Sequence, residues 1–118
     1  MLKVIALLKR KPGLSMEDFV HYYETRHAPL MTRLQQPEMT GYRRNFVQVE
    51  GGIFSDGEGP WFDVITELYF PDRAAYERCM ARNAEPEPTR LREEDEANFL
   101  DQSKIHFFIV EEAETKLG

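Results

Sequence analysis

The sequence predicts a single α+β domain with a four-stranded antiparallel sheet, and two observations support this fold class. The chain has 118 residues, of which 42% are hydrophobic and 12% aromatic, which is enough for one buried core but leaves no room for a second domain. Along the chain, hydrophobic patterns typical of strands and helices follow one another as strand, helix, strand, strand, helix and strand. We therefore expect residues 1–118 to fold as one unit.

The first element is a strand over residues 2–9, LKVIALLK. Both of its alternating residue sets are apolar between the lysines, which is typical of a strand that is covered on both faces. Because Lys3 and Lys9 interrupt the run and no small-residue cleavage site follows, we interpret it as a mature strand and not as a signal peptide.

The next segment is a helix that begins at about Met16, with Ser15 as a favourable N-cap residue. Pro29 has no N–H group and clashes with the carbonyl of Thr25, so we expect this helix to end or kink at His27 and to restart with Pro29 in a first-turn position. Apolar residues recur at spacings of three and four, and His27 falls on the stripe that they form: Met16, Phe19, Val20, Tyr23, Leu30, Met31 and Leu34.

The second half of the chain supplies the remaining elements. We expect strands over residues 39–50 and 61–70, joined by the Gly- and Pro-rich connection GGIFSDGEGP. Pro71 and Asp72 begin a second helix, and residues 83–89, NAEPEPT, should terminate it. A shorter helix over residues 90–98 then leads to the last strand, KIHFFIV.

This order of elements is that of the ferredoxin-like βαββαβ fold, in which helices cover one face of an antiparallel sheet. The first and last strands nevertheless have apolar side chains on both faces, such as Phe107 and Phe108 in the last strand. In a small chain the simplest cover for the second face is another copy, so we expect a homodimer in which two sheets pack together.

Charge and cysteine content exclude several classes of function. A net charge of −6 and a pI near 5.1 argue against a surface that binds phosphate backbones, so we expect neither nucleic acid nor membrane as a partner. The lone Cys79 cannot form an intramolecular disulfide, and no cysteine or histidine cluster surrounds it that would indicate zinc. We expect a cytoplasmic protein.

The opening segment LKVIALLKRKPGLSMEDFVHYYETRHAPL resembles that of the EthD-like proteins, which belong to the dimeric α/β-barrel superfamily. The segments FDVITELYF and EDEANFLDQSKIHFFIVEE are similar to the third strand and to the closing helix and strand of the family. In the second strand, YRRNFVQVE stands where family members often carry a Gln or His. The resemblance implies a ferredoxin-like fold, a dimer and a pocket between helices and sheet.

The resemblance does not select a reaction, because one fold serves many functions. Relatives in the family are linked to ether-degradation gene clusters or look like dehydratases and decarboxylases of polyketide pathways. The wider superfamily includes cofactorless oxygenases, cyclases, isomerases and haem-handling proteins.

Three residues are candidates for a catalytic site. A histidine side chain, with a reference pKa of about 6.5, suits proton exchange at cellular pH, which makes His27 a candidate, although a histidine on an apolar stripe can also be a core residue with one satisfied hydrogen bond. Tyr23 lies four residues earlier on the same face. It could donate a hydrogen bond to a ligand, form a flat wall against an aromatic ligand, or be simply a core residue. Asp95 shares a helix face with Leu91 and Phe99, and it could orient His27, act as a base or remain solvated like Glu93, Glu94 and Glu96.

Other chemistry has weaker support. We expect Tyr22 at an edge, and Asp63 and Glu67 in salt bridges, with Arg43 as a partner for Glu67. His106 lies in a distant strand without the histidine partner that a metal site would need. His21 and His27 lie on different sides of a helix, so we expect no metal site, and Cys79 has no basic neighbour to activate it. His27 alone would suffice as a haem ligand, but no second feature indicates haem, and we expect no cofactor.

Two functions from different classes remain open. The first is a cofactor-independent lyase, cyclase, isomerase or oxygenase that acts on a small hydrophobic or aromatic oxygenated compound, with His27 as general acid or base and Tyr23 or Asp95 assisting. The second is a non-catalytic protein that binds a small hydrophobic ligand or assists a partner oxidoreductase. A cavity that touches His27 and a second titratable group would favour catalysis, and a purely apolar cavity would favour binding.

Overall fold

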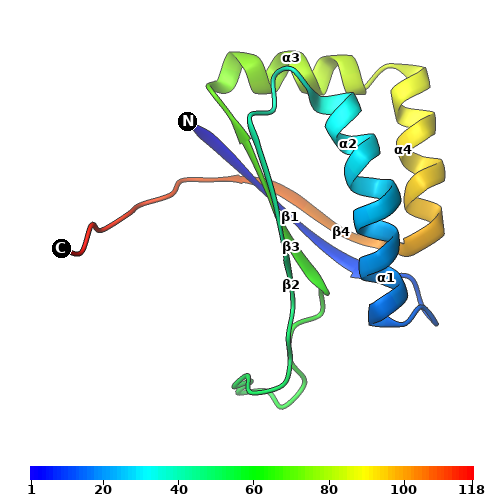
Figure 1. The fold of residues 1–118 in the computed structure, drawn as a ribbon, viewed down its shortest axis with the longest axis vertical. Coiled ribbons are helices and arrows are strands. Elements are labelled where there is room, and N and C mark those ends of the chain that lie inside the picture. The colour runs from blue at the N-terminus through cyan, green and yellow to red at the C-terminus, as the bar shows by residue number, and fades with distance from the viewer.

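The predicted ferredoxin-like α+β architecture is confirmed. The computed structural model describes all 118 residues, and its sheet has the order β2-β3-β1-β4 with every neighbouring pair antiparallel (Figure 1). No helix is long and apolar enough to cross a membrane. The elements in chain order are β1 (Leu2–Arg10), α1 (Met16–Tyr22), η1 (Tyr23–His27), α2 (Ala28–Gln35), β2 (Gly41–Phe46), β3 (Val64–Phe70), α3 (Arg73–Asn83), α4 (Pro86–Phe99) and β4 (Leu100–Val110).

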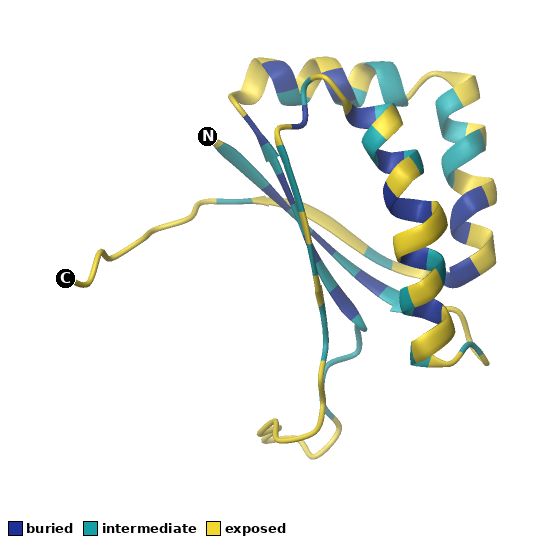
Figure 2. Ribbon diagram, viewed as in Figure 1, coloured by how far each residue is buried: buried dark blue, intermediate teal, exposed yellow.

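All helices lie on one face of the sheet, and no helix covers the other face (Figures 1 and 2). Along β3, every second residue from Val64 to Phe70 is buried beneath the helices. We call the opposite side the open face. It carries Lys3, Ile5 and Leu7 of β1, Ile65, Glu67 and Tyr69 of β3, and His106, Phe108 and Val110 of β4. Phe108 is 42% exposed there, which confirms that the sheet has apolar residues on both faces.

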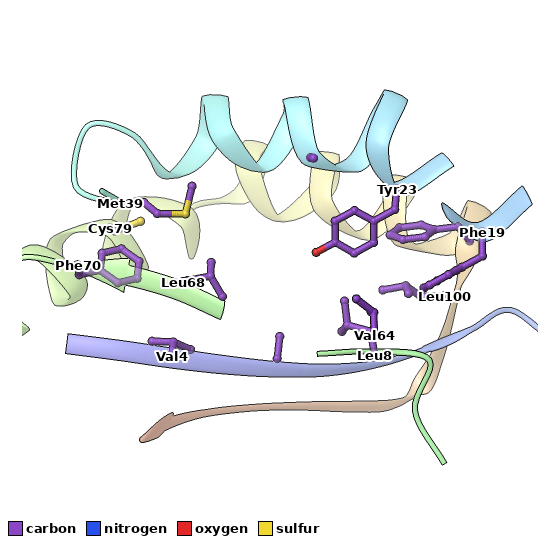
Figure 3. Packing of buried hydrophobic residues seen from close by; sticks show 13 residues of the cluster. Val4, Leu8, Phe19, Tyr23, Met39, Val64, Leu68, Phe70, Cys79 and Leu100 are labelled. Atoms are coloured by element: carbon purple, nitrogen blue, oxygen red, sulfur yellow. The ribbon is translucent and has the colours of Figure 1, made fainter. Parts of the chain in front are cut away.

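The hydrophobic core fills the layer between helices and sheet (Figure 3). Phe19 and Tyr23 from the first helical segment pack edge to face, and both also contact Phe99 of α4. Each of these rings is fully buried, and burial of one such side chain stabilises the fold by roughly 1.5 to 3 kcal/mol. The aromatic cluster therefore fixes α1 and α4 relative to each other and to the sheet.

The predicted interruption at His27 is confirmed, and it takes the form of a π-helical turn, η1. The N–H of Ala28 donates to the carbonyl of Tyr23, five residues earlier, and α2 then begins with Pro29 in its first turn. A wider turn keeps the proline ring away from the Thr25 carbonyl, so that the chain continues in a nearly straight line. Ser15 also caps α1 as expected, since its Oγ accepts from the Asp18 N–H at 3.1 Å.

The π turn preserves an unusual spacing of buried residues. In a regular α-helix, positions four residues apart drift around the axis by about 40° per step, or about 160° over four steps. Here one residue in four remains buried across the whole segment, namely Phe19, Tyr23, His27, Met31 and Gln35. The extra residue in η1 compensates for the drift and keeps this row facing the interior.

Several predicted boundaries were wrong. The segment that contains Pro86 and Pro88 does not separate two helices by a long break but forms the first turn of α4, which starts at Pro86 and not at Arg90. Proline is tolerated there because the N–H that it lacks would have no helical partner in a first turn. The strands β2 and β3 are shorter than predicted, and β4 begins earlier, at Leu100.

Candidate active site

A cavity of about 330 Å³ lies between the helices and the sheet face that they cover. Most of its lining residues are hydrophobic, and its wall draws on β1, β2, β3, β4 and the helices that cover them. The lining residues that can exchange protons or hydrogen bonds are Tyr23, His27, Gln35, Tyr42, Thr66, Asn83, Arg92 and Glu96. An apolar cavity with a few convergent polar groups is the usual form of a small-molecule site.

His27 is oriented by a carboxylate from another helix. Its Nδ1 atom lies 2.6 Å from Oδ2 of Asp95 in α4, and both side chains are more than nine-tenths buried. The other ring nitrogen, Nε2, makes no hydrogen bond within the protein, and the ring lines the cavity. A carboxylate at Nδ1 selects the tautomer with the proton on Nδ1, which leaves the lone pair of Nε2 for a ligand.

Asp95 itself does not line the cavity, because its second oxygen is used elsewhere. Oδ1 accepts a hydrogen bond of 2.9 Å from the Tyr22 hydroxyl, which in turn accepts one from Asn98 at 3.0 Å. The Tyr22 ring also stacks on Phe99 with a centroid distance of 4.8 Å. Tyr22, which we expected at an edge, therefore holds one carboxylate oxygen of Asp95 while His27 lies at the other.

Tyr23 lines the cavity, and its hydroxyl group belongs to a short hydrogen-bonded chain. Its Oη lies 2.6 Å from Oγ1 of Thr66 and accepts a hydrogen bond of 3.0 Å from the Tyr42 hydroxyl. Burial raises the pKa of both tyrosines, so both phenols remain protonated at neutral pH. Figure 3 shows the Tyr23 ring between the helix layer and strand β1. Tyr23 can therefore donate a hydrogen bond but cannot act as a base.

Glu96 was expected to be solvated, and this was wrong. Its side chain is only 11% exposed and lines the cavity, since α4 turns this position toward the sheet. Arg92 lies one helical turn earlier, with a guanidinium nitrogen 3.4 Å from the Glu96 carboxylate. Burial raises the pKa of Glu96, and the positive charge of Arg92 offsets this increase only in part.

The remaining sequence candidates lie away from the cavity and have structural partners. Asp63 accepts from the backbone N–H of Arg10 at 2.8 Å. We had expected Arg43 as the partner of Glu67, but Glu67 instead pairs with Lys3 at 2.7 Å. The Lys3 ammonium group lowers the pKa of Glu67 to about 2. The ring of His106 packs on Trp61. Cys79 is fully buried, which raises the pKa of its thiol.

No group of three or more His, Cys, Asp or Glu side chains lies close enough together to hold a metal ion. Six polar residues of the cavity wall were not predicted from the sequence, namely Gln35, Tyr42, Thr66, Asn83, Arg92 and Glu96. Tyr42 and Thr66 come from strands whose alternation was visible, but only the packing of the sheet beneath the first helix brings them to Tyr23.

Comparison with known proteins extends this description. The family model of the EthD domain matches residues 11–103. The chain belongs to the EthD family. A solved EthD family protein from Bacillus halodurans C-125 has 20% identity and a TM-score of 0.65, and the match covers 96% of this chain and 100% of the other. The search of curated proteins finds no match.

Two further solved structures share the fold of this EthD protein. SnoaB, a cofactor-independent oxygenase from Streptomyces nogalater, is 12% identical with a TM-score of 0.60, covering 97% of this chain and 94% of its own. A dimeric ferredoxin-like protein from Jannaschia sp. CCS1 is 17% identical with a TM-score of 0.57, covering 93% and 97%. At these identities the likeness establishes the fold alone.

Proposed function

We propose that this EthD protein is a cofactor-independent enzyme that moves protons on a small, apolar, oxygenated compound held in the cavity, as a lyase, cyclase or isomerase. The observation that carries the proposal is the pairing of His27 with Asp95, which leaves Nε2 unbonded at the cavity wall. The alternative, a purely ligand-binding or accessory protein, predicts an apolar wall. The presence of Tyr23, Glu96 and His27 together on the wall favours catalysis.

The proposed first step is common to these reaction classes. Nε2 of His27 removes a proton from a carbon next to a carbonyl group of the substrate, and the electron pair of the C–H bond becomes that of an enolate. The Tyr23 hydroxyl donates a hydrogen bond to the enolate oxygen. The Tyr42 hydroxyl donates to Tyr23, and this polarises the Tyr23 hydroxyl and strengthens its hydrogen bond to the enolate. Asp95 acts as a positioning residue, which holds the imidazole and stabilises the imidazolium that forms.

The proton then returns from the imidazolium to the compound. If it is delivered to a different carbon, the product is an isomer, and if it is delivered to a departing hydroxyl group, water leaves and the enzyme is a lyase. A cyclase uses the enolate carbon to attack a second carbonyl group within the same molecule. Each course conserves atoms and electrons without a redox cofactor.

The proposal includes a cytoplasmic homodimer in which two open faces pack together. The apolar residues Ile5, Leu7 and Phe108 are adjacent on that face and have no cover from the chain's own helices. The dimeric relative with the same fold supports this arrangement. An interface of standard size would bury roughly 1,200 to 2,000 Å² in total.

The experiment that tests the enzymatic proposal begins with native mass spectrometry of protein purified from its host, to identify a retained compound. Turnover of that compound is then compared between the wild type and His27→Gln, which keeps a polar side chain of similar length but removes the imidazole ring. We expect a loss of about 10²- to 10⁴-fold in rate, with the compound still bound.

The matched control is His21→Gln, because His21 is exposed on the same helix and outside the cavity. It should retain the wild-type rate. Full turnover by a folded His27→Gln variant would place the proton chemistry elsewhere, and binding without turnover by the wild type would favour the accessory function.

A further inference from the structure

Gln35 carries a buried polar atom that the proposed chemistry does not use. The residue closes α2 at the far end of the row of buried residues, lines the cavity and is 9% exposed. Its Oε1 atom is fully buried and has no hydrogen-bond partner in the structure. An unpaired buried carbonyl oxygen is unfavourable, so a group that supplied a donor there would be bound preferentially.

The orientation of the amide group determines what kind of partner is missing. The Nε2 group of Gln35 is directed at the sulfur of Met31, 3.7 Å away, which is a weak acceptor. The neighbouring amide nitrogen of Asn83 has no free donor capacity, since it donates to the carbonyls of Leu34 and Cys79. The group without a hydrogen-bond partner at this end of the cavity is therefore an acceptor, Oε1 of Gln35, and a ligand would have to supply a hydroxyl or N–H donor.

The spacing along α2 sets the distance between this acceptor and the proton-transfer group. His27 and Gln35 are eight residues apart, which corresponds to about 12 Å along a helix axis. The wall between them is apolar and includes Met31 and Leu68. Met31 has an unbranched side chain that can shift to let a ligand group reach Gln35.

We propose that Gln35 is a specificity residue that accepts a hydrogen bond from a hydroxyl group at the end of the substrate remote from the carbon that His27 deprotonates. The substrate class is thereby narrowed to elongated apolar or aromatic compounds with a carbonyl group at one end and a hydroxyl group at the other. The inference rests on the proposed function only for the orientation of the ligand, with its carbonyl group at Tyr23 and His27.

A set of three matched probes tests the inference by calorimetric titration. The compounds are 4-acetyl-4′-hydroxybiphenyl, 4-acetyl-4′-methoxybiphenyl and 4-acetylbiphenyl, which share one carbonyl end. The methoxy group can accept but cannot donate a hydrogen bond. Comparison with the hydroxy compound therefore shows whether the protein group at this end of the cavity accepts or donates the hydrogen bond. We expect the wild type to bind the hydroxy compound about 10-fold more tightly than either of the others.

Gln35→Met should abolish this preference, so that the affinities for the three probes agree within about 2-fold. Methionine has a similar length and lacks the amide, and the backbone carbonyl of Gln35 that accepts from the Met39 N–H is unaffected. Gln36→Met is the matched control, because Gln36 is the next residue, is exposed and does not line the cavity. It should keep the wild-type preference.

A second measurement does not depend on the variant. In the wild type, the side-chain amide resonances of Gln35 should shift further at saturation with the hydroxy compound than at saturation with the methoxy compound, because only the hydroxy compound donates a hydrogen bond to Oε1. If Gln35→Met does not fold, Gln35→Leu takes its place in the titrations.

Two results would overturn the inference. One is a wild type that does not prefer the hydroxy compound, or binds none of the three, in which case an ordered water is the partner of Gln35. The other is a preference that survives in Gln35→Met, which would place the hydroxyl elsewhere. Neither result depends on turnover, so a failure of the catalytic proposal with His27→Gln remains a separate outcome.

Discussion

The Nδ1 atom of His27 lies 2.6 Å from Oδ2 of Asp95, although the two residues are 68 positions apart in the sequence. The contact joins the end of the π turn to the last turns of α4, and the Phe99 ring packs beside it with a centroid 4.8 Å from that of His27. A buried carboxylate and imidazole that satisfy each other in this way form one unit. Changes to either residue should therefore alter the properties of the other.

Asp95→Asn should leave the fold intact and lower kcat by about 10- to 100-fold, with KM nearly unchanged. The asparagine fills the same space but no longer selects a single tautomer of His27, so part of the protein carries its proton on Nε2. Nitrogen-15 NMR of the imidazole would show this mixture, which loss of a merely structural contact would not produce. Glu94→Gln, on the exposed side of α4, should change neither kcat nor the tautomer.

Tyr22→Phe should reduce the free energy of unfolding by about 1 to 2 kcal/mol, because it removes the hydrogen bond to Asp95 Oδ1 while keeping the ring on Phe99. Urea unfolding measures the change. Tyr76→Phe is the control, since the Tyr76 ring also packs on a phenylalanine but its hydroxyl makes no hydrogen bond in the structure; it should change the stability by less than about 0.5 kcal/mol. Equal losses in both variants would contradict the role given to Tyr22.

Glu96→Gln should stabilise the protein at neutral pH by about 1 kcal/mol. Burial raises the folded-state pKa of Glu96 above its usual value of 4.5, so ionisation of this group opposes folding, and the penalty grows as the pH rises above 4.5. At lower pH the carboxyl is protonated in both the folded and the unfolded state, and the variant should then match the wild type. Thermal unfolding at pH 4 and pH 7 tests this sign, with the exposed Glu93→Gln expected to show no such gain.

Phe108→Glu should convert the proposed dimer to a monomer of about 13.9 kDa in sedimentation at micromolar concentration. A carboxylate on the open face, opposite Ile5, could not be buried between two sheets without a partner charge. Phe54→Glu makes the same change in the irregular connection between β2 and β3 and should remain dimeric. A wild type that sediments as a monomer would contradict the proposed interface and leave the apolar residues of the open face without a function.

The sequence was sufficient for the order of elements because each element carries its own local signal. Ser15 and Asp72 cap the helices that follow them, and the alternation in Val64–Phe70 directly gives the buried face of β3. Pro29 likewise indicated an interruption near His27. The start of α4 was misplaced because proline in isolation marks both the end of a helix and its first turn.

The site was only partly predictable, because its geometry depends on contacts between distant elements. The spacing of His27 and Tyr23 on one helix placed both on the cavity side, and the face shared by Asp95 and Phe99 placed Asp95 near them. The burial of Glu96 could not be inferred, since Glu93 and Glu94 beside it are exposed and only the packing of α4 distinguishes them. Gln35 lies in a polar stretch before Pro37, where nothing in the local pattern indicates a cavity.

The π turn has a consequence for how this chain can vary. Because η1 contains one residue more than a regular helical turn, removal of any single residue between Tyr23 and His27 would restore an α-helix and rotate one half of the segment by about 100° against the other. Met31 and Gln35 would then leave the cavity while Phe19 stayed in the core, or the reverse. We infer that substitutions at the exposed positions Glu24, Thr25 and Arg26 are tolerated far better than any deletion among them. The length of this segment is a stricter requirement than its composition.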